Sequence, residues 1–165
     1  MLKKYAHWVD TLNQTIAHMI RWLALAMVVI TLAVVVLRYA FNMGAIPLQE
    51  SIMYLHGILF MLAIPYGLKQ DSHVRVDIVY SRLQHKHQRW IDISGHVLFL
   101  LPLGVFILVT SLPYVAASWR VLEGSAEVGG IPAIFLLKSL IPLMAVLLLL
   151  QGGSEIIKKI TSQTQ

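Results

Sequence analysis

Four long apolar runs, separated by charged and polar stretches, dominate the hydrophobicity pattern of this chain. Because the hydrocarbon core of a bilayer is about 30 Å thick, a helix of roughly 20 apolar residues spans it. We therefore predict an all-α membrane protein with four transmembrane helices, folded as one compact membrane domain over residues 1–165. The spans are expected at about residues 22–41, 51–68, 93–119 and 131–151.

The third run is longer than a bilayer requires. At 1.5 Å per residue, residues 93–119 would form a helix of about 40 Å. We expect this helix to tilt in the membrane, or to bend at Pro102 and Pro113.

Two further stretches are amphipathic. In residues 1–21 apolar positions recur every three or four residues, which predicts an interfacial helix that lies on the membrane before the chain turns into the first span. A similar spacing after Asp77, at Tyr80, Leu83, His87 and Trp90, predicts an amphipathic cytoplasmic segment between the second and third spans. Each stretch is either a membrane anchor or a helix that docks a partner.

The charges indicate how the chain is oriented. Most Lys and Arg residues lie before the first span, between the second and third, or after the fourth, whereas the two other connections hold only Arg38 and Arg120. The positive-inside rule therefore places both termini in the cytoplasm. The net charge of +5 is accounted for by this anchoring beside anionic lipid, so we expect no nucleic-acid partner. The chain has no Cys, which excludes disulfides and Cys-ligated metal centres.

Apart from Arg38 near the end of the first span, Lys138 is the one Lys, Arg, Asp or Glu side chain within the expected spans. It either snorkels toward the membrane surface or pairs with a carboxylate, for which Glu50 and a residue of another subunit are the candidates. None of the expected spans has an interior Asp or Glu, although coupled carriers usually need such groups or broken helices near the midplane. The chain is therefore a poor candidate for a pump by itself.

The histidines raise the possibility of haem or metal binding. His56 and His96 are expected near opposite membrane surfaces, whereas a bis-His haem needs two facing ligands at one depth. His85 and His87 are two residues apart and therefore lie on different faces of a helix. We expect no cofactor and no metal site, and keep a haem-b-type membrane anchor of a respiratory enzyme as the alternative function.

The two connections on the side opposite the termini carry exposed charge. They are either solvated loops or the rim that receives a partner protein. The candidate docking residues are Arg38, Glu50, Arg120, Glu123 and Glu127.

Several short motifs occur together and in order. They are RYAF at 38–41, Glu50 opening the second span, HVRVD at 73–77, GGIP at 129–132, Lys138, and LQG at 150–152. With four spans and a length of 165 residues, this pattern resembles the small membrane subunit (the DctQ-like subunit) of tripartite ATP-independent periplasmic (TRAP) transporters. The resemblance covers roughly residues 20–155.

The resemblance implies a non-catalytic subunit in the bacterial inner membrane. It implies a tight heterodimer with a large elevator-type membrane subunit that holds the substrate and sodium sites, and transient contact with a periplasmic protein that delivers an organic acid. The small subunit would brace the large one and help to dock the binding protein. His73, Arg75 and Asp77 would have structural roles in the cytoplasmic loop.

Overall fold

The computed structural model describes residues 1–70, 80 and 83–161, and the part of the chain that it describes is helical, without strands. Four helical segments are long and apolar enough to cross a membrane. They are α1 (Leu2–Phe41), α2 (Ile46–Lys69), a third segment from His85 to Arg120, and α6 (Ile134–Thr161). The predicted all-α fold with four helices long enough to span a membrane is thereby confirmed.

Helix α1 is one continuous helix of 40 residues, so the predicted turn between an interfacial helix and the first span is wrong. There is no Gly or Pro between Leu2 and Phe41 to interrupt it. The helix ends where Asn42 adopts a left-handed conformation with φ of 53°. The first half of α1 also buries Ala6, Val9 and Asn13 against the protein, which a helix lying alone on the membrane would not do.

The third span is likewise continuous with the amphipathic segment before it. It comprises α4 (His85–Gly95), a π-helical segment (His96–Leu100) and α5 (Leu101–Arg120). The π-helical segment immediately precedes the Leu101–Pro102 bond, at one of the two prolines where the length of this run predicted a bend. Pro102 has no N–H to donate and its ring crowds the preceding turn, and a wider turn relieves that crowding.

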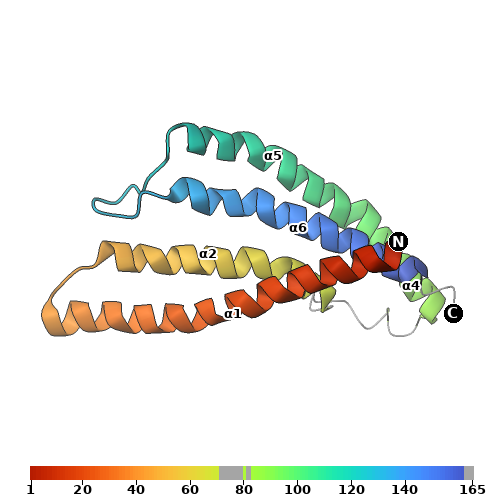
Figure 1. Cartoon of the computed structure of the whole chain (residues 1–165), viewed down its shortest axis with the longest axis horizontal. Coiled ribbons are helices and arrows are strands. Elements are labelled where there is room, and N and C mark those ends of the chain that lie inside the picture. The colour runs from red at the N-terminus through yellow and green to blue at the C-terminus, as the bar shows by residue number, and fades with distance from the viewer. Residues whose placement is uncertain (71–79, 81–82, 162–165) are drawn as a thin grey trace.

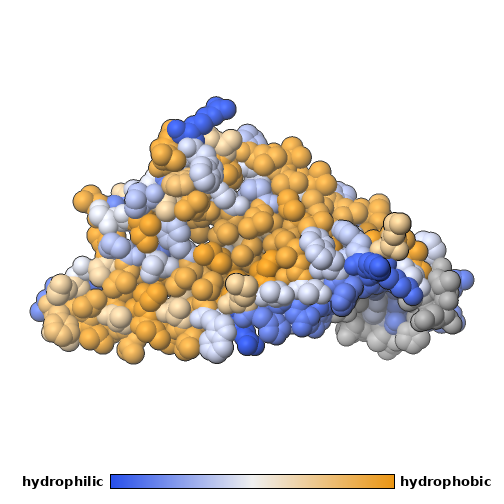
Figure 2. Space-filling model, in the orientation of Figure 1, coloured by the Kyte–Doolittle hydropathy of each residue, from blue (hydrophilic) through white to orange (hydrophobic). Residues whose placement is uncertain are grey.

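The four spans form an open row (Figure 1). Helix α2 packs between α1 and α6, and α6 packs between α2 and α5. Within the described part of the chain, α5 makes no more than marginal contact with α1 or α2. As a result much apolar surface stays uncovered, and Figure 2 shows it over the second half of α1.

The two ends of the row of helices differ from each other. The connections 42–45 and 121–133 lie at one end, which we call the loop end. The start of α1, the end of α2 and the end of α6 lie at the other, which we call the terminal end (Figure 1). Hydrophilic side chains gather over the first half of α1 near the terminal end (Figure 2).

A buried polar network closes the row at the terminal end by joining α1 to α6. Gln151 is fully buried; its Oε1 accepts a hydrogen bond from Asn13 Nδ2 (2.7 Å) and its Nε2 donates to Asp10 Oδ1 (3.0 Å). Lys158 bridges the carboxylates of Asp10 and Glu155 at 2.7 Å each. Because unpaired polar groups are costly in an apolar surrounding, these partners fix α1 against α6.

Glycines let α5 and α6 approach each other closely. A Cβ atom added to Gly104 of α5 would lie 2.7 Å from Leu149 Cδ2 of α6, and one added to Gly152 of α6 would clash with Leu100 Cδ2 in the π-helical segment of the third span. Each glycine therefore accepts a leucine of the facing helix. By contrast, a Cβ atom at Gly95 would meet nothing within 4 Å.

This difference predicts the outcome of two matched substitutions. Both Gly95→Ala and Gly104→Ala gain the helix preference of alanine, about 0.5–1 kcal/mol. Gly104→Ala also forces Leu149 to move, and overpacking costs about 1–3 kcal/mol. We expect Gly104→Ala to unfold at a lower temperature than Gly95→Ala when the purified chains are heated in detergent. Equal midpoints would contradict the close packing of α5 on α6.

Candidate docking site at the loop end

Glu50, one turn after the start of α2, holds the connection between α5 and α6. Its Oε2 accepts a hydrogen bond from the Ile131 N–H (2.5 Å), and its Oε1 accepts one from Ser125 Oγ. One turn further along α2, the Tyr54 hydroxyl donates to the Ile131 carbonyl oxygen (3.3 Å). Both backbone groups of Ile131 are thus bound by α2.

We call the contacts of Glu50 with Ile131 and Ser125 the Glu50 clasp. It explains why the GGIP motif has a glycine at position 130. A Cβ atom at Gly130 would lie 2.5 Å from Ser125 Oγ and 2.6 Å from Glu50 Oε1, closer than real Cβ atoms come. Any larger residue would displace the carboxylate from its donors. Neither Ser125 nor this role of Gly130 was predicted from the sequence.

Lys138 forms a second link at the loop end. Its Nζ donates to Glu123 Oε2 (2.5 Å) and lies 4.3 Å from the centroid of the Tyr114 ring. Within this chain the carboxylate paired with Lys138 is therefore Glu123, and the predicted pairing with Glu50 is wrong. Glu50 is occupied by Ile131 and Ser125.

The depth of Lys138 also differs from the prediction. Helix α6 begins at Ile134 rather than Ile131, so Lys138 stands only one turn from its start, about 6 Å at 1.5 Å per residue. The Glu123 carbonyl accepts a hydrogen bond from the Phe135 N–H (3.4 Å). This bond holds Glu123 close to the first turn of α6.

The pair with Lys138 changes the ionisation of Glu123. The hydrogen bond from the Lys138 ammonium lowers the pKa of the Glu123 carboxyl below its usual value of 4.5. The carboxylate is therefore charged at neutral pH and remains so under mildly acidic conditions. Solvent reaches this pair, which weakens its net attraction.

Three of the five candidate docking residues remain exposed. Arg38 in the last turn of α1, Arg120 at the end of α5 and Glu127 in the connection have no side-chain hydrogen bond or ion pair with any described residue. Arg38 and Arg120 lie on the two outer helices of the row (Figure 1). Glu50 and Glu123, in contrast, hold the connection in place.

Three further site residues were predicted from the sequence. His73, Arg75 and Asp77 lie outside the described residues. Among the residues that are described, no group of three His, Cys, Asp or Glu side chains is placed to hold a metal ion. His56 is exposed on α2, and His96 lines a cavity beside α4 and α5.

The Glu50 clasp predicts a local change in amide exchange. Glu50→Ala removes both acceptor oxygens, so the Ile131 N–H and the Ser125 hydroxyl both lose their partner. Loss of a hydrogen bond to a charged group, about 1.5–3 kcal/mol, predicts that the Ile131 amide exchanges at least about tenfold faster. Glu127→Gln removes a charge from the same connection without touching the clasp and serves as the control. Hydrogen–deuterium exchange measures both, and equal rates would refute the clasp.

The Glu123–Lys138 pair predicts non-additive stability effects. Glu123→Gln and Lys138→Met should each lower the unfolding temperature, and the double variant should lose less than the sum of both. Because the folded-state pKa of Glu123 is lowered, the pair stabilises the protein above pH 4.5, and this contribution is lost as the pH falls through the lowered pKa. The difference between wild type and Glu123→Gln should therefore shrink on acidification. Strict additivity at pH 7 would argue against the pair.

The comparisons with known proteins agree with this architecture. The family model for the DctQ component of tripartite ATP-independent periplasmic transporters matches residues 27–162, which includes all of α2, α5 and the clasp. No curated protein and no solved structure matches the chain. The family match gives no support to the alternative of a haem-b-type anchor. Since the match covers most of the sequence, the chain belongs to the DctQ component family, the small membrane component of TRAP transporters.

Proposed function

We propose that this chain is the small permease subunit of a sodium-coupled TRAP transporter that imports an organic acid across the bacterial inner membrane. It braces the large elevator-type subunit, which holds the substrate and sodium sites, and helps to dock the periplasmic substrate-binding protein. The observation that carries the proposal is the family match over residues 27–162. The distribution of Lys and Arg supports cytoplasmic termini and a periplasmic loop end.

The bracing role is supported by the open row of helices. Spans packed in a row leave wide apolar faces that suit a stable contact with a second membrane protein. The docking role is supported by the connection 121–133. Glu50 and the Glu123–Lys138 pair hold this connection against α2 and α6, so it offers a formed surface at the loop end.

Affinity purification from native membranes tests the proposal. A tag on this chain should recover a much larger polytopic membrane protein of the same transporter, identified by mass spectrometry. Recovery of the chain alone, or together with haem and a soluble dehydrogenase, would overturn the proposal.

The docking role predicts an effect of charge at the loop end. Arg120→Glu should slow association of the binding protein with the purified complex several-fold at low salt, with a smaller effect at high salt, because exposed charges act mainly on the association rate. Lys4→Glu makes the same change on an exposed residue at the terminal end and should have no effect. Biolayer interferometry on nanodisc-embedded complex measures the rates. Unchanged association of Arg120→Glu would remove Arg120 from the docking surface.

A further inference from the structure

One face of α2 is exposed although it carries an ionisable side chain. Met53, His56 and Phe60 are spaced by three and four residues and therefore lie on one side of the helix. Met53 and Phe60 are 44% and 60% exposed, and His56 is exposed as well. We call these three residues the His56 face.

The His56 face lies well inside the membrane-spanning helix. His56 is roughly 15 Å along the axis from Ile46, at 1.5 Å per residue. This is close to the middle of a helix of 24 residues, and deeper than the expectation of a position near one membrane surface. Ionisable groups at such depth are rare, and almost always face protein or a water-filled cavity.

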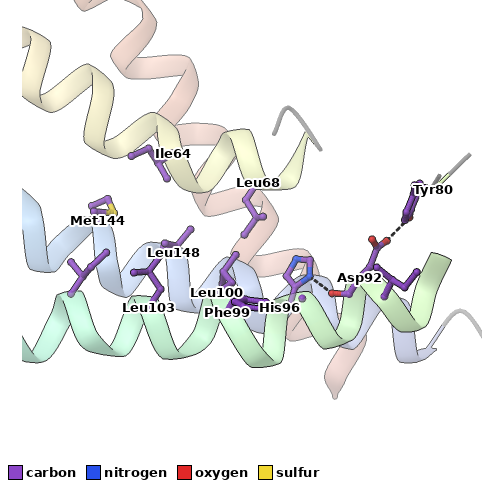
Figure 3. A pocket seen from close by; sticks show the side chains of 13 residues that line it. Ile64, Leu68, Tyr80, Asp92, His96, Phe99, Leu100, Leu103, Met144 and Leu148 are labelled. Atoms are coloured by element: carbon purple, nitrogen blue, oxygen red, sulfur yellow. Dashed lines mark hydrogen bonds between the residues drawn. The ribbon is translucent and has the colours of Figure 1, made fainter. Parts of the chain in front are cut away.

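An apolar cavity of about 670 Å³ begins one turn beyond Phe60 along α2. Ile64, one turn after Phe60, lines this cavity together with Leu68. Figure 3 shows Ile64 and Leu68 of α2 on one side, and Leu100, Leu103 and Leu148 of the third span and α6 on the other. We call the His56 face and this cavity together the trough.

Both imidazoles of this trough have unused hydrogen-bonding capacity. His56 stacks on Phe60 with ring centroids 6.1 Å apart, and its ring nitrogens have no partner among the described residues. In the cavity, His96 Nδ1 donates to the Asp92 carbonyl oxygen (2.6 Å), while the buried Nε2 has no partner among the described residues. Since Nδ1 carries the proton, Nε2 is left as an acceptor.

These observations restrict what covers the trough. Acyl chains match its apolar walls, but they offer no hydrogen bond to either imidazole, and lipid headgroups lie nearer the membrane surface than His56. A membrane-spanning helix matches the apolar walls and can carry polar side chains at the two depths.

We propose that the trough formed by the His56 face and the adjoining cavity is the surface on which a membrane-spanning helix of the large subunit packs. Polar side chains of that helix form hydrogen bonds with His56 and His96. The inference rests on the proposed function, because that function supplies the large subunit as the partner.

Site-specific photo-crosslinking tests the surface. We would place p-benzoylphenylalanine at Phe60 in the His56 face, and at Val146 as the matched control. Val146 is also exposed on a span (40%). It is two residues from each of the cavity residues Met144 and Leu148, so it lies about 160° from both of them around α6. Membranes containing all transporter subunits are irradiated, and the adducts are identified by mass spectrometry.

The expected result is a large-subunit adduct from position 60 that exceeds the one from position 146 at least about fivefold. An adduct with a second copy of this chain, an adduct with phospholipid alone, or an equal yield from position 146 would overturn the proposal. If the large subunit co-purifies but crosslinks only from position 146, this surface is wrong while the proposed function stands. If it does not co-purify at all, both fail.

A pair of substitutions tests the role of the imidazole. His56→Leu should lower the recovery of the large subunit about 3- to 10-fold, the range expected for one interhelical hydrogen bond in a membrane. His56→Gln retains a donor and an acceptor and should recover more than His56→Leu. Equal recovery with His56→Leu and wild type would show that the imidazole does not contact the large subunit.

Discussion

The requirement that polar groups find partners inside the protein shapes the whole molecule, and the network around Gln151 meets it at the terminal end. Buried Gln151 is stable because Asn13 donates to its oxygen and Asp10 and Glu155 accept from its NH2 group. These bonds draw the first half of α1 across to α6, while its second half runs beside α2 (Figure 1). The row of helices is therefore tied together at one end.

The same cations serve two purposes at the terminal end. Lys158 pairs with Asp10 and Glu155, and Lys159 pairs with Asp92. Arg89 donates to the Ile160 carbonyl oxygen (3.0 Å), and Lys69 donates to Gln14 (2.8 Å). Positive charge that favours a cytoplasmic location thus also fastens the helices to one another, so orientation and packing depend on overlapping sets of residues.

The sequence predicted what depends on local pattern. Four apolar runs gave four spans, and short motifs in order identified the family. The continuity of α1 was missed because the partners of Asp10 and Asn13 lie about 140 residues away, at Gln151, and no local periodicity reveals them. The exposed charges at the loop end were recognised, but the sequence could not tell that Glu50 binds Ile131 or that Lys138 pairs with Glu123. Those pairs depend on how the connection 121–133 folds against α2 and α6.

The central claim is that this chain completes its apolar surface by binding a large membrane subunit. The most direct measurement is the thermal unfolding of the purified chain in nanodiscs, with and without increasing amounts of the purified large subunit of the same transporter. A partner that binds only the folded chain raises the unfolding temperature in proportion to the logarithm of its concentration above the dissociation constant. The account predicts such a rise. An unfolding temperature that stays the same at every concentration of the large subunit would contradict it.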